Sequence, residues 1–130
     1  MRLVLDTNVV VSAFINPKGT PSQIIKFILQ GKAQLVYNTQ ILEEYIIVMA
    51  RPKFSGKIDP NLIHRFIELI KNTGFLFDPL PGKNKLPDEK DRIFYDTAKN
   101  SGSILISGNI KHYPKEAFIL PPGDFIKRLS

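Results

Sequence analysis

The sequence predicts an α/β fold in which a mostly parallel sheet carries helices on both faces. Two observations predict it. Short apolar runs, typical of buried strands, alternate along the chain with longer segments whose apolar residues recur at helical spacing. Between them stand proline, glycine and Asn or Asp residues, which mark turns and helix ends. Strands that alternate with helices pair in parallel, because each helix carries the chain back to the same end of the sheet.

The chain opens on a strand. Leu3, Val4 and Leu5 form a continuous apolar run, as in a strand that is buried on both faces. Similar runs recur along the chain and predict a sheet of about five strands. The expected strands are residues 3–5, 34–37, 75–77, 103–107 and 117–120.

The helices between these strands are marked by starts and stops. Proline in the first turn favours helix starts at Pro21 and Pro60, and glycine favours ends before Gly31, Gly74 and Gly102. A surface loop is expected where prolines and lysines cluster before the fifth helix. The expected helices are residues 9–15, 21–30, 40–50, 60–73, 90–101 and 124–129, and the expected loop is residues 78–89.

The composition favours a single domain, residues 1–130, with a polyanionic partner. A chain of 130 residues with 43% hydrophobic residues can bury a core. It holds no cysteine, which excludes disulfides and thiolate metal sites. No apolar run approaches the roughly 20 residues of a membrane span and no signal-peptide pattern opens the chain, so we expect a cytoplasmic protein. The formal net charge of +6 favours nucleic acid as a partner.

Polar residues follow two of the predicted strands. Asp6 ends the first strand, and ligands of open α/β folds bind at the carboxyl edge of the sheet. The other interpretation of Asp6 is an N-cap for the helix that begins near Asn8. After the fourth strand, Ser107 and Asn109 place a hydroxyl and an amide oxygen at a strand end, although Gly-Asn also forms simple turns.

The predicted helix over residues 40–50 carries two adjacent acids. At about 100° per residue, Glu43 and Glu44 lie on opposite sides of its apolar stripe, and periodicity does not separate them. Their other interpretation is a solvated pair in the first turn, where the helix dipole favours acids. The residues alone therefore leave open which glutamate faces the interior.

The predicted helix over residues 90–101 presents one acid to the interior. Asp91 lies about 20° from the inward-facing Ala98 on the helical wheel, so it can face a cleft from the first turn. The helix dipole would also stabilise an acid at this position without any ligand. Asp96 lies on roughly the opposite face, and Asp88 points away or precedes the helix.

Acids from these segments would converge at one edge of the sheet. Several carboxylates in one cleft repel one another, which raises their pKa values. A divalent cation removes this conflict, and oxygen ligands without cysteine suit Mg²⁺ or Mn²⁺. Asp6, Asp91 and one of the two glutamates are therefore candidate metal ligands. His112 is a candidate substrate contact in a loop.

Four segments, in this order and spacing, resemble the motifs of the PIN-domain family over essentially the whole chain. The first contains Asp6, the second Glu44, the third Asp91 and the fourth Asn109. Many members of the family carry Asp where this chain has Asn109, and an amide contributes no charge to a metal site. The matching segments are residues 4–9, 41–45, 91–95 with Ala98, and 105–109 followed by 111–114.

The resemblance implies a three-layer α/β/α fold with strand order 3-2-1-4-5. It also implies a Mg²⁺- or Mn²⁺-dependent endoribonuclease, the toxin of a toxin–antitoxin pair, with an RNA substrate, a protein antitoxin as partner and a homodimeric state. On this assignment the metal ligands are Asp6, Glu44 and Asp91, which act in catalysis together with Asn109 while Asn8 and Ser107 orient the acids or the water. The lysines that would receive the RNA backbone are Lys53, Lys57, Lys83, Lys85, Lys111 and Lys115.

Two other function classes stay open. Because of Asn109, the chain could be a catalytically weak or inactive module that binds RNA or protein, and its RNA affinity would then be indifferent to Mg²⁺ and Mn²⁺. A phosphotransferase that forms an aspartyl-phosphate would carry Asp-x-Asp, but Asn8 stands at the second position. The chain also lacks the G-x-x-x-x-G-K-[ST] loop of nucleotide-binding proteins.

Overall fold

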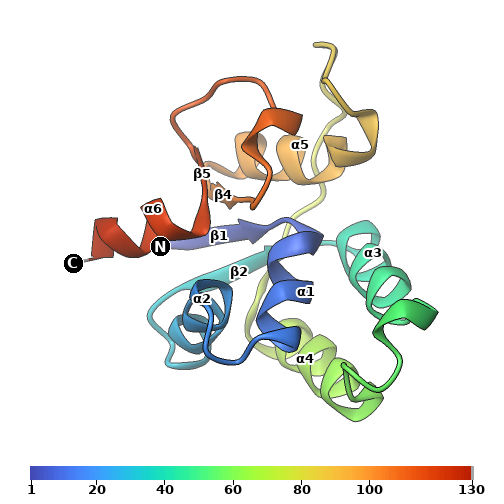
Figure 1. Ribbon diagram of the computed structural model, residues 1–130. Coiled ribbons are helices and arrows are strands. Elements are labelled where there is room, and N and C mark those ends of the chain that lie inside the picture. Colours follow the sequence, from blue (N-terminus) through green and yellow to red (C-terminus); the bar gives the residue numbers. More distant parts are fainter. Residues whose placement is uncertain (130) are drawn as a thin grey trace.

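The computed structural model describes residues 1–129, and it confirms the predicted α/β architecture (Figure 1). Within these residues five parallel strands form one sheet in the order β3-β2-β1-β4-β5, as the resemblance implied. The order places β1 at the centre with β4 beside it, so their carboxyl ends are neighbours. The strands are β1 (Arg2–Leu5), β2 (Gln34–Tyr37), β3 (Phe75–Leu76), β4 (Ile104–Ile106) and β5 (Ile119–Leu120).

Helices cover both faces of the sheet. Helix α5 packs on β1, β2 and β4, while α4 packs against β2, and α1 contacts α2 and α3. Figure 1 shows α5 above the strands, α1, α2 and α4 below them, and α3 beyond the carboxyl end of β1. The helices are α1 (Thr7–Ile15), α2 (Thr20–Leu29), α3 (Thr39–Met49), α4 (Pro60–Thr73), α5 (Arg92–Ser101) and α6 (Pro122–Leu129), with short 3₁₀ turns η1 (Pro52–Phe54), η2 (Glu89–Asp91) and η3 (Ile110–His112).

The centre of the core is the first strand. Leu3, Val4 and Leu5 are fully buried, as their continuous apolar run predicts. The hydroxyl of Tyr45 donates a 2.6 Å hydrogen bond to the carbonyl oxygen of Leu5, which ties α3 to the end of β1. Burial, and then the charge of Asp6, raise the pKa of Tyr45, so this hydroxyl keeps its proton and remains a donor.

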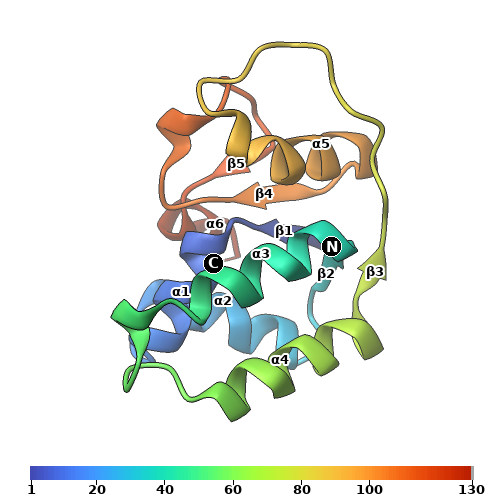
Figure 2. The same cartoon turned by 90° about the vertical axis from the view of Figure 1, so that its right-hand side faces the viewer.

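Local signals explain most helix starts. Asn38 caps α3 by accepting the Ile41 N–H (3.0 Å), and Asp59 caps α4 by accepting the Asn61 N–H (2.9 Å). Figure 2 shows α3 running between the α5 layer and the α4 layer. Gly102 ends α5 with a left-handed φ of 67°, which glycine adopts without strain.

The start of α5 differs from the prediction. The helix was expected from residue 90, but it begins at Arg92, and Asp91 belongs to the 3₁₀ turn η2 that precedes it. The turn forms because Asp88 accepts the Lys90 N–H at 3.0 Å. The guanidinium of Arg92 also binds Glu89 at 2.6 Å, which holds η2 against the first turn of α5.

Smaller corrections affect element ends. The first helix begins at Thr7 because Asp6 caps it, and α6 begins two residues before the expected start, at Pro122. The turn η3 was not predicted from the sequence. Within residues 1–129, no helix combines the length and the apolar character that crossing a membrane would require.

Candidate functional site

An open cavity of about 370 Å³ lies where β1 ends, and its walls come from five separate segments of the chain. The start of α1, helix α3, turn η1, the segment around η2 and turn η3 all contribute to it. Acidic and basic side chains share its lining. The acids are Asp6, Glu44, Asp88 and Asp91, and the bases are Arg51, Lys53, Lys90 and His112.

Asp6 lies at the base of this cavity and is held by several donors. Its side chain belongs to a residue that is only 6% exposed. Oδ2 accepts hydrogen bonds from Ser107 Oγ at 2.9 Å and from the Tyr113 hydroxyl at 2.7 Å. Oδ1 accepts a longer bond of 3.4 Å from the Asn8 N–H, which caps α1. The two interpretations of Asp6, a helix cap and a cavity carboxylate, therefore hold together.

Tyr113 is a partner of Asp6 that the sequence analysis missed. Its ring is buried, and burial followed by the charge of Asp6 and their hydrogen bond raises its pKa. The hydroxyl therefore donates to Asp6 throughout the physiological pH range. The signal in the sequence was weak, because Tyr113 lies 107 residues from Asp6 and follows the fourth motif without a role of its own.

The two glutamates of α3 have different surroundings. Glu44 is half-buried and lines the cavity, whereas Glu43 is exposed. The hydrogen bond from the neighbouring Tyr45 to the end of β1 fixes the rotation of the helix that produces this difference. The geometry thus separates two residues that periodicity left equivalent, while a role for Glu44 in catalysis stays a prediction.

Asp91 lacks the partners that Asp6 has. Its side chain is 15% exposed, and its Oδ2 is buried without a hydrogen-bond partner. Burial, together with the charges of Asp6 and Asp88, raises the pKa of Asp91 to about 6, and the nearby His112 offsets part of this rise. A carboxylate in this position is costly to ionise without a positive partner.

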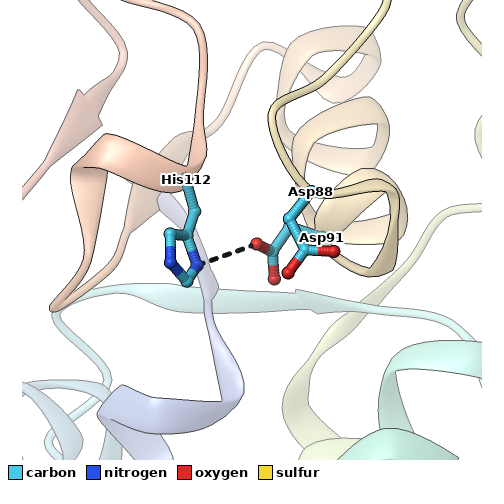
Figure 3. A group of neighbouring side chains, drawn as sticks. All are labelled: Asp88, Asp91 and His112. Atoms are coloured by element: carbon cyan, nitrogen blue, oxygen red, sulfur yellow. Dashed lines mark ion pairs between the residues drawn. The ribbon is translucent and has the colours of Figure 1, made fainter.

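His112 and Asp88 are the other groups at this end of the cavity (Figure 3). Nδ1 of His112 lies 3.4 Å from Oδ2 of Asp91, a charge pair only when the imidazole is protonated. One ligand atom from each of Asp88, Asp91 and His112 lies within 4.8 Å of the others. Asp88 was predicted either to point away from the interior or to precede the helix, and it does precede α5. It caps η2, and it lines the cavity.

Ser107, Asn109 and Asn8 connect the ends of β1 and β4. Ser107 is fully buried, accepts the Asn109 N–H at 3.0 Å and donates to Asp6. Asn8 Oδ1 accepts the Gly108 N–H at 3.2 Å, which fixes the start of α1 to the turn after β4. The Asn109 amide nitrogen lies 2.9 Å from Nε2 of His112, so this side chain contacts the imidazole rather than Asp6.

Asp96 belongs to a different region. It is only 3% exposed, accepts the Gly82 N–H at 3.0 Å and lies 3.4 Å from a guanidinium nitrogen of Arg92. These contacts attach the loop over residues 78–89 to α5. Asp96 is therefore a buried structural acid, and it does not replace the charge that Asn109 lacks.

Basic groups also reach the cavity. Of the six lysines expected to contact RNA, Lys53 lines it, and Arg51 and Lys90 join it there. The prediction missed Arg51 because this residue lies just after the end of α3, and the sequence does not show in which direction its side chain extends. Positive side chains therefore stand beside the carboxylates in this cavity, where they can attract an anionic group.

The donor set fits a divalent cation. It consists of carboxylate oxygens and one imidazole, and the buried Oδ2 of Asp91 accepts no hydrogen bond within the described residues. The three predicted acids Asp6, Glu44 and Asp91 line this cavity from the end of β1, from α3 and from η2. Among the described residues, the group whose ligand atoms lie within 4.8 Å of one another is Asp88, Asp91 and His112, which contains only Asp91 of the three. Their role as ligands remains a prediction.

Comparison with known proteins supports a family assignment. The family model described as PIN domain matches residues 2–111. The chain is also similar to the uncharacterized protein MJ1680 of Methanocaldococcus jannaschii, with 30% identity over 110 residues, which cover 84% of this chain and 71% of that protein. PIN domains are generally nucleases and typically use divalent metal ions. The chain belongs to the PIN-domain family.

Proposed function

We propose that this protein is a metal-dependent endoribonuclease that hydrolyses RNA phosphodiester bonds with Mg²⁺ or Mn²⁺. The observation that carries the proposal is the buried, unpartnered Oδ2 of Asp91 in a cavity that it shares with Asp6 and Glu44. Acids that repel one another in one cavity are stabilised by a cation. A phosphodiester nuclease needs such a cation beside the substrate phosphate.

The proposal gives each residue a role. Asp6, Glu44 and Asp91 hold the cation, and a bound cation acidifies water and stabilises the charge that develops on the scissile phosphate. Ser107 and Tyr113 donate to Oδ2 of Asp6, so Oδ1, which accepts only the longer bond from the Asn8 N–H, is the oxygen that would bind the cation. Asn8 orients the turn that carries Ser107 and Asn109, and Asn109 assists catalysis from the end of β4.

The substrate class follows from charge. The formal net charge is +6, and Arg51, Lys53 and Lys90 line the same cavity as the acids. These cations would neutralise phosphates on either side of the cleaved bond, so RNA binding would weaken as salt rises. The choice of RNA over DNA rests on the family resemblance.

The biological setting is part of the proposal. On the same resemblance, the protein acts in the cytoplasm as the toxin of a toxin–antitoxin pair, is inhibited by a protein antitoxin and forms a homodimer. A second candidate function is favoured by one observation, the amide of Asn109, which adds no charge at the end of β4. A module that only binds RNA would need neither Mg²⁺ nor Mn²⁺.

A pair of neighbouring substitutions tests the proposal. We expect metal-free protein to cleave labelled RNA only after Mn²⁺ or Mg²⁺ is added, and to leave 5′-phosphate ends. Glu44→Gln should remove this activity, whereas Glu43→Gln should retain it, because only the first side chain lines the cavity. Binding of RNA without any cation-dependent product, in wild type at all metal concentrations, would favour the binding module instead.

A further inference from the structure

One short segment after β4 contacts both ends of the cavity. Ser107 and Tyr113 donate to Asp6, and between them His112 faces Asp91 from the turn η3. The tyrosine and the serine hold an acid that is already well bonded. The histidine instead lies beside the carboxylate oxygen that has no hydrogen-bond partner.

The imidazole and two carboxylates can converge on one point (Figure 3). Ligand atoms of Asp88, Asp91 and His112 all lie within 4.8 Å of one another. The contact between His112 Nδ1 and Asp91 Oδ2, at 3.4 Å, does not satisfy that oxygen as a hydrogen bond would. The His112 side chain is 47% exposed, so a ligand can reach the ring.

The far nitrogen of the imidazole already has a partner. The side-chain amide of Asn109 lies 2.9 Å from Nε2 of His112. A metal-bound histidine normally donates its second ring N–H to an oxygen, which fixes its tautomer and orientation. Asn offers both an oxygen and an NH₂ group from one amide, so a half-turn about its terminal bond presents the acceptor.

We infer that His112 supplies a nitrogen ligand to the cation of the proposed nuclease, beside Asp91 and Asp88, and that Asn109 positions its imidazole. The inference rests on the proposed function and assigns Asn109 a task that a metal-ligating acid would not perform. A mixed nitrogen and oxygen set favours Mn²⁺ over Mg²⁺, because Mg²⁺ prefers oxygen ligands whereas imidazole suits transition metals.

Pulsed electron paramagnetic resonance of Mn²⁺ tests this directly. The chain has two histidines, and the other one, His64, is exposed on α4 and does not line the cavity. We expect ¹⁴N modulation on Mn²⁺ bound to wild type and to His64→Gln, and its loss in His112→Gln. Calorimetry should show the ratio of Mn²⁺ to Mg²⁺ affinity falling about tenfold in His112→Gln and staying unchanged in His64→Gln.

The role of Asn109 has its own measurement. Asn109→Ala should keep the ¹⁴N modulation but weaken Mn²⁺ binding, because the imidazole is present and no longer oriented. Unchanged Mn²⁺ affinity in this variant would reject the positioning role.

The outcomes separate this inference from the proposed function. Wild type could bind Mn²⁺ without ¹⁴N modulation, while Asp91→Asn abolishes the binding. This result would overturn the histidine ligand and leave the nuclease proposal standing. An affinity ratio that does not change in His112→Gln would overturn the selectivity. Absence of any Mn²⁺ or Mg²⁺ binding to wild type would overturn both.

Discussion

The carboxylates at the two ends of the cavity differ in how many hydrogen bonds they accept from the protein. At the sheet end, Asp6 accepts two side-chain hydroxyls and a backbone N–H, so its position is fixed by the protein alone. At the other end, Asp91 lies before α5 with one buried oxygen that accepts no hydrogen bond, and burial, followed by the charges of Asp6 and Asp88, raises its pKa to about 6. The protein itself holds the first acid in place, whereas the second has only His112 beside it and would gain more from a bound cation.

This difference relates the stability of the metal-free protein to its binding of a cation. The hydrogen bonds that orient Asp6 are present before any ligand arrives. The unsatisfied Asp91 lowers the stability of the metal-free protein, and a cation would recover that free energy on binding. Substitutions at the two ends should therefore have opposite effects on stability.

The largest expected effect comes from Asp6→Asn. The amide keeps an oxygen for the two hydroxyl donors but removes the negative charge that would hold the cation. We expect cation-dependent RNA hydrolysis to fall by about a thousandfold, the equivalent of several kcal/mol of transition-state stabilisation. Circular dichroism and a single cooperative melt should show that the fold is retained. Cleavage at the wild-type rate would remove Asp6 from the site.

At Asp91, removal of the charge is expected to raise the free energy of unfolding of the metal-free protein. Its pKa in the folded protein, about 6, lies above the ordinary value of 3.8, so the folded state favours the protonated acid. The metal-free wild type therefore loses stability as pH rises from about 4 to about 6, and it bears the full cost above that range. In metal-free buffer at pH 8, Asp91→Asn should unfold with a free energy higher than wild type by on the order of 2 kcal/mol.

Denaturant titrations at several pH values check this prediction. The difference between Asp91→Asn and wild type should vanish near pH 4, and added Mn²⁺ should stabilise wild type much more than the variant. Asp96→Asn serves as the matched control, because Asp96 is a buried acid of α5 that is bonded to Gly82 and Arg92, and its substitution should destabilise the protein. A destabilised Asp91→Asn at pH 8 would contradict the account.

A smaller loss is expected when the tyrosine hydroxyl at the sheet end is removed. Tyr113→Phe deletes one of two hydroxyl donors to Oδ2 of Asp6 and leaves the ring in place. A buried hydrogen bond to a charged group contributes about 1.5–3 kcal/mol, so the free energy of unfolding should fall by about 1.5 kcal/mol. Chemical denaturation would measure it. An unchanged midpoint would show that the bond from Tyr113 to Asp6 adds nothing to the free energy of unfolding.

The sequence alone could predict the elements but not the contacts between them. Caps such as Asn38 and Asp59, and apolar runs such as Leu3 to Leu5, act within a few residues, so local patterns locate their helices and strand. The bond between Tyr113 and Asp6 joins residues 107 apart and has no local signal.

The candidate site shows the same limit. Periodicity left Glu43 and Glu44 equivalent, because a bond from Tyr45 to the end of β1 decides the rotation of α3. The break before α5 was missed because an Asp88 cap there competes with helix continuation. Whether a segment forms a capped turn or continues a helix depends on the loop that packs against it. A helical wheel does not include that loop.

The smallest effect concerns the basic groups beside the two acids. Arg51→Ala in an Asp6→Asn background, where RNA is not cleaved, should weaken RNA binding and reduce the slope of log K against log salt by about 0.7. Lys127→Ala is the control, since Lys127 is exposed on α6 at the opposite end of the sheet. Equal salt slopes for both variants would place the RNA elsewhere.

The most direct test of the central claim is anomalous diffraction from a crystal soaked with Mn²⁺. The account predicts one strong anomalous peak in the cavity, within ligand distance of both Asp6 and Asp91. A fully soaked crystal with no peak there, or with Mn²⁺ bound only to acids outside the cavity, would contradict it.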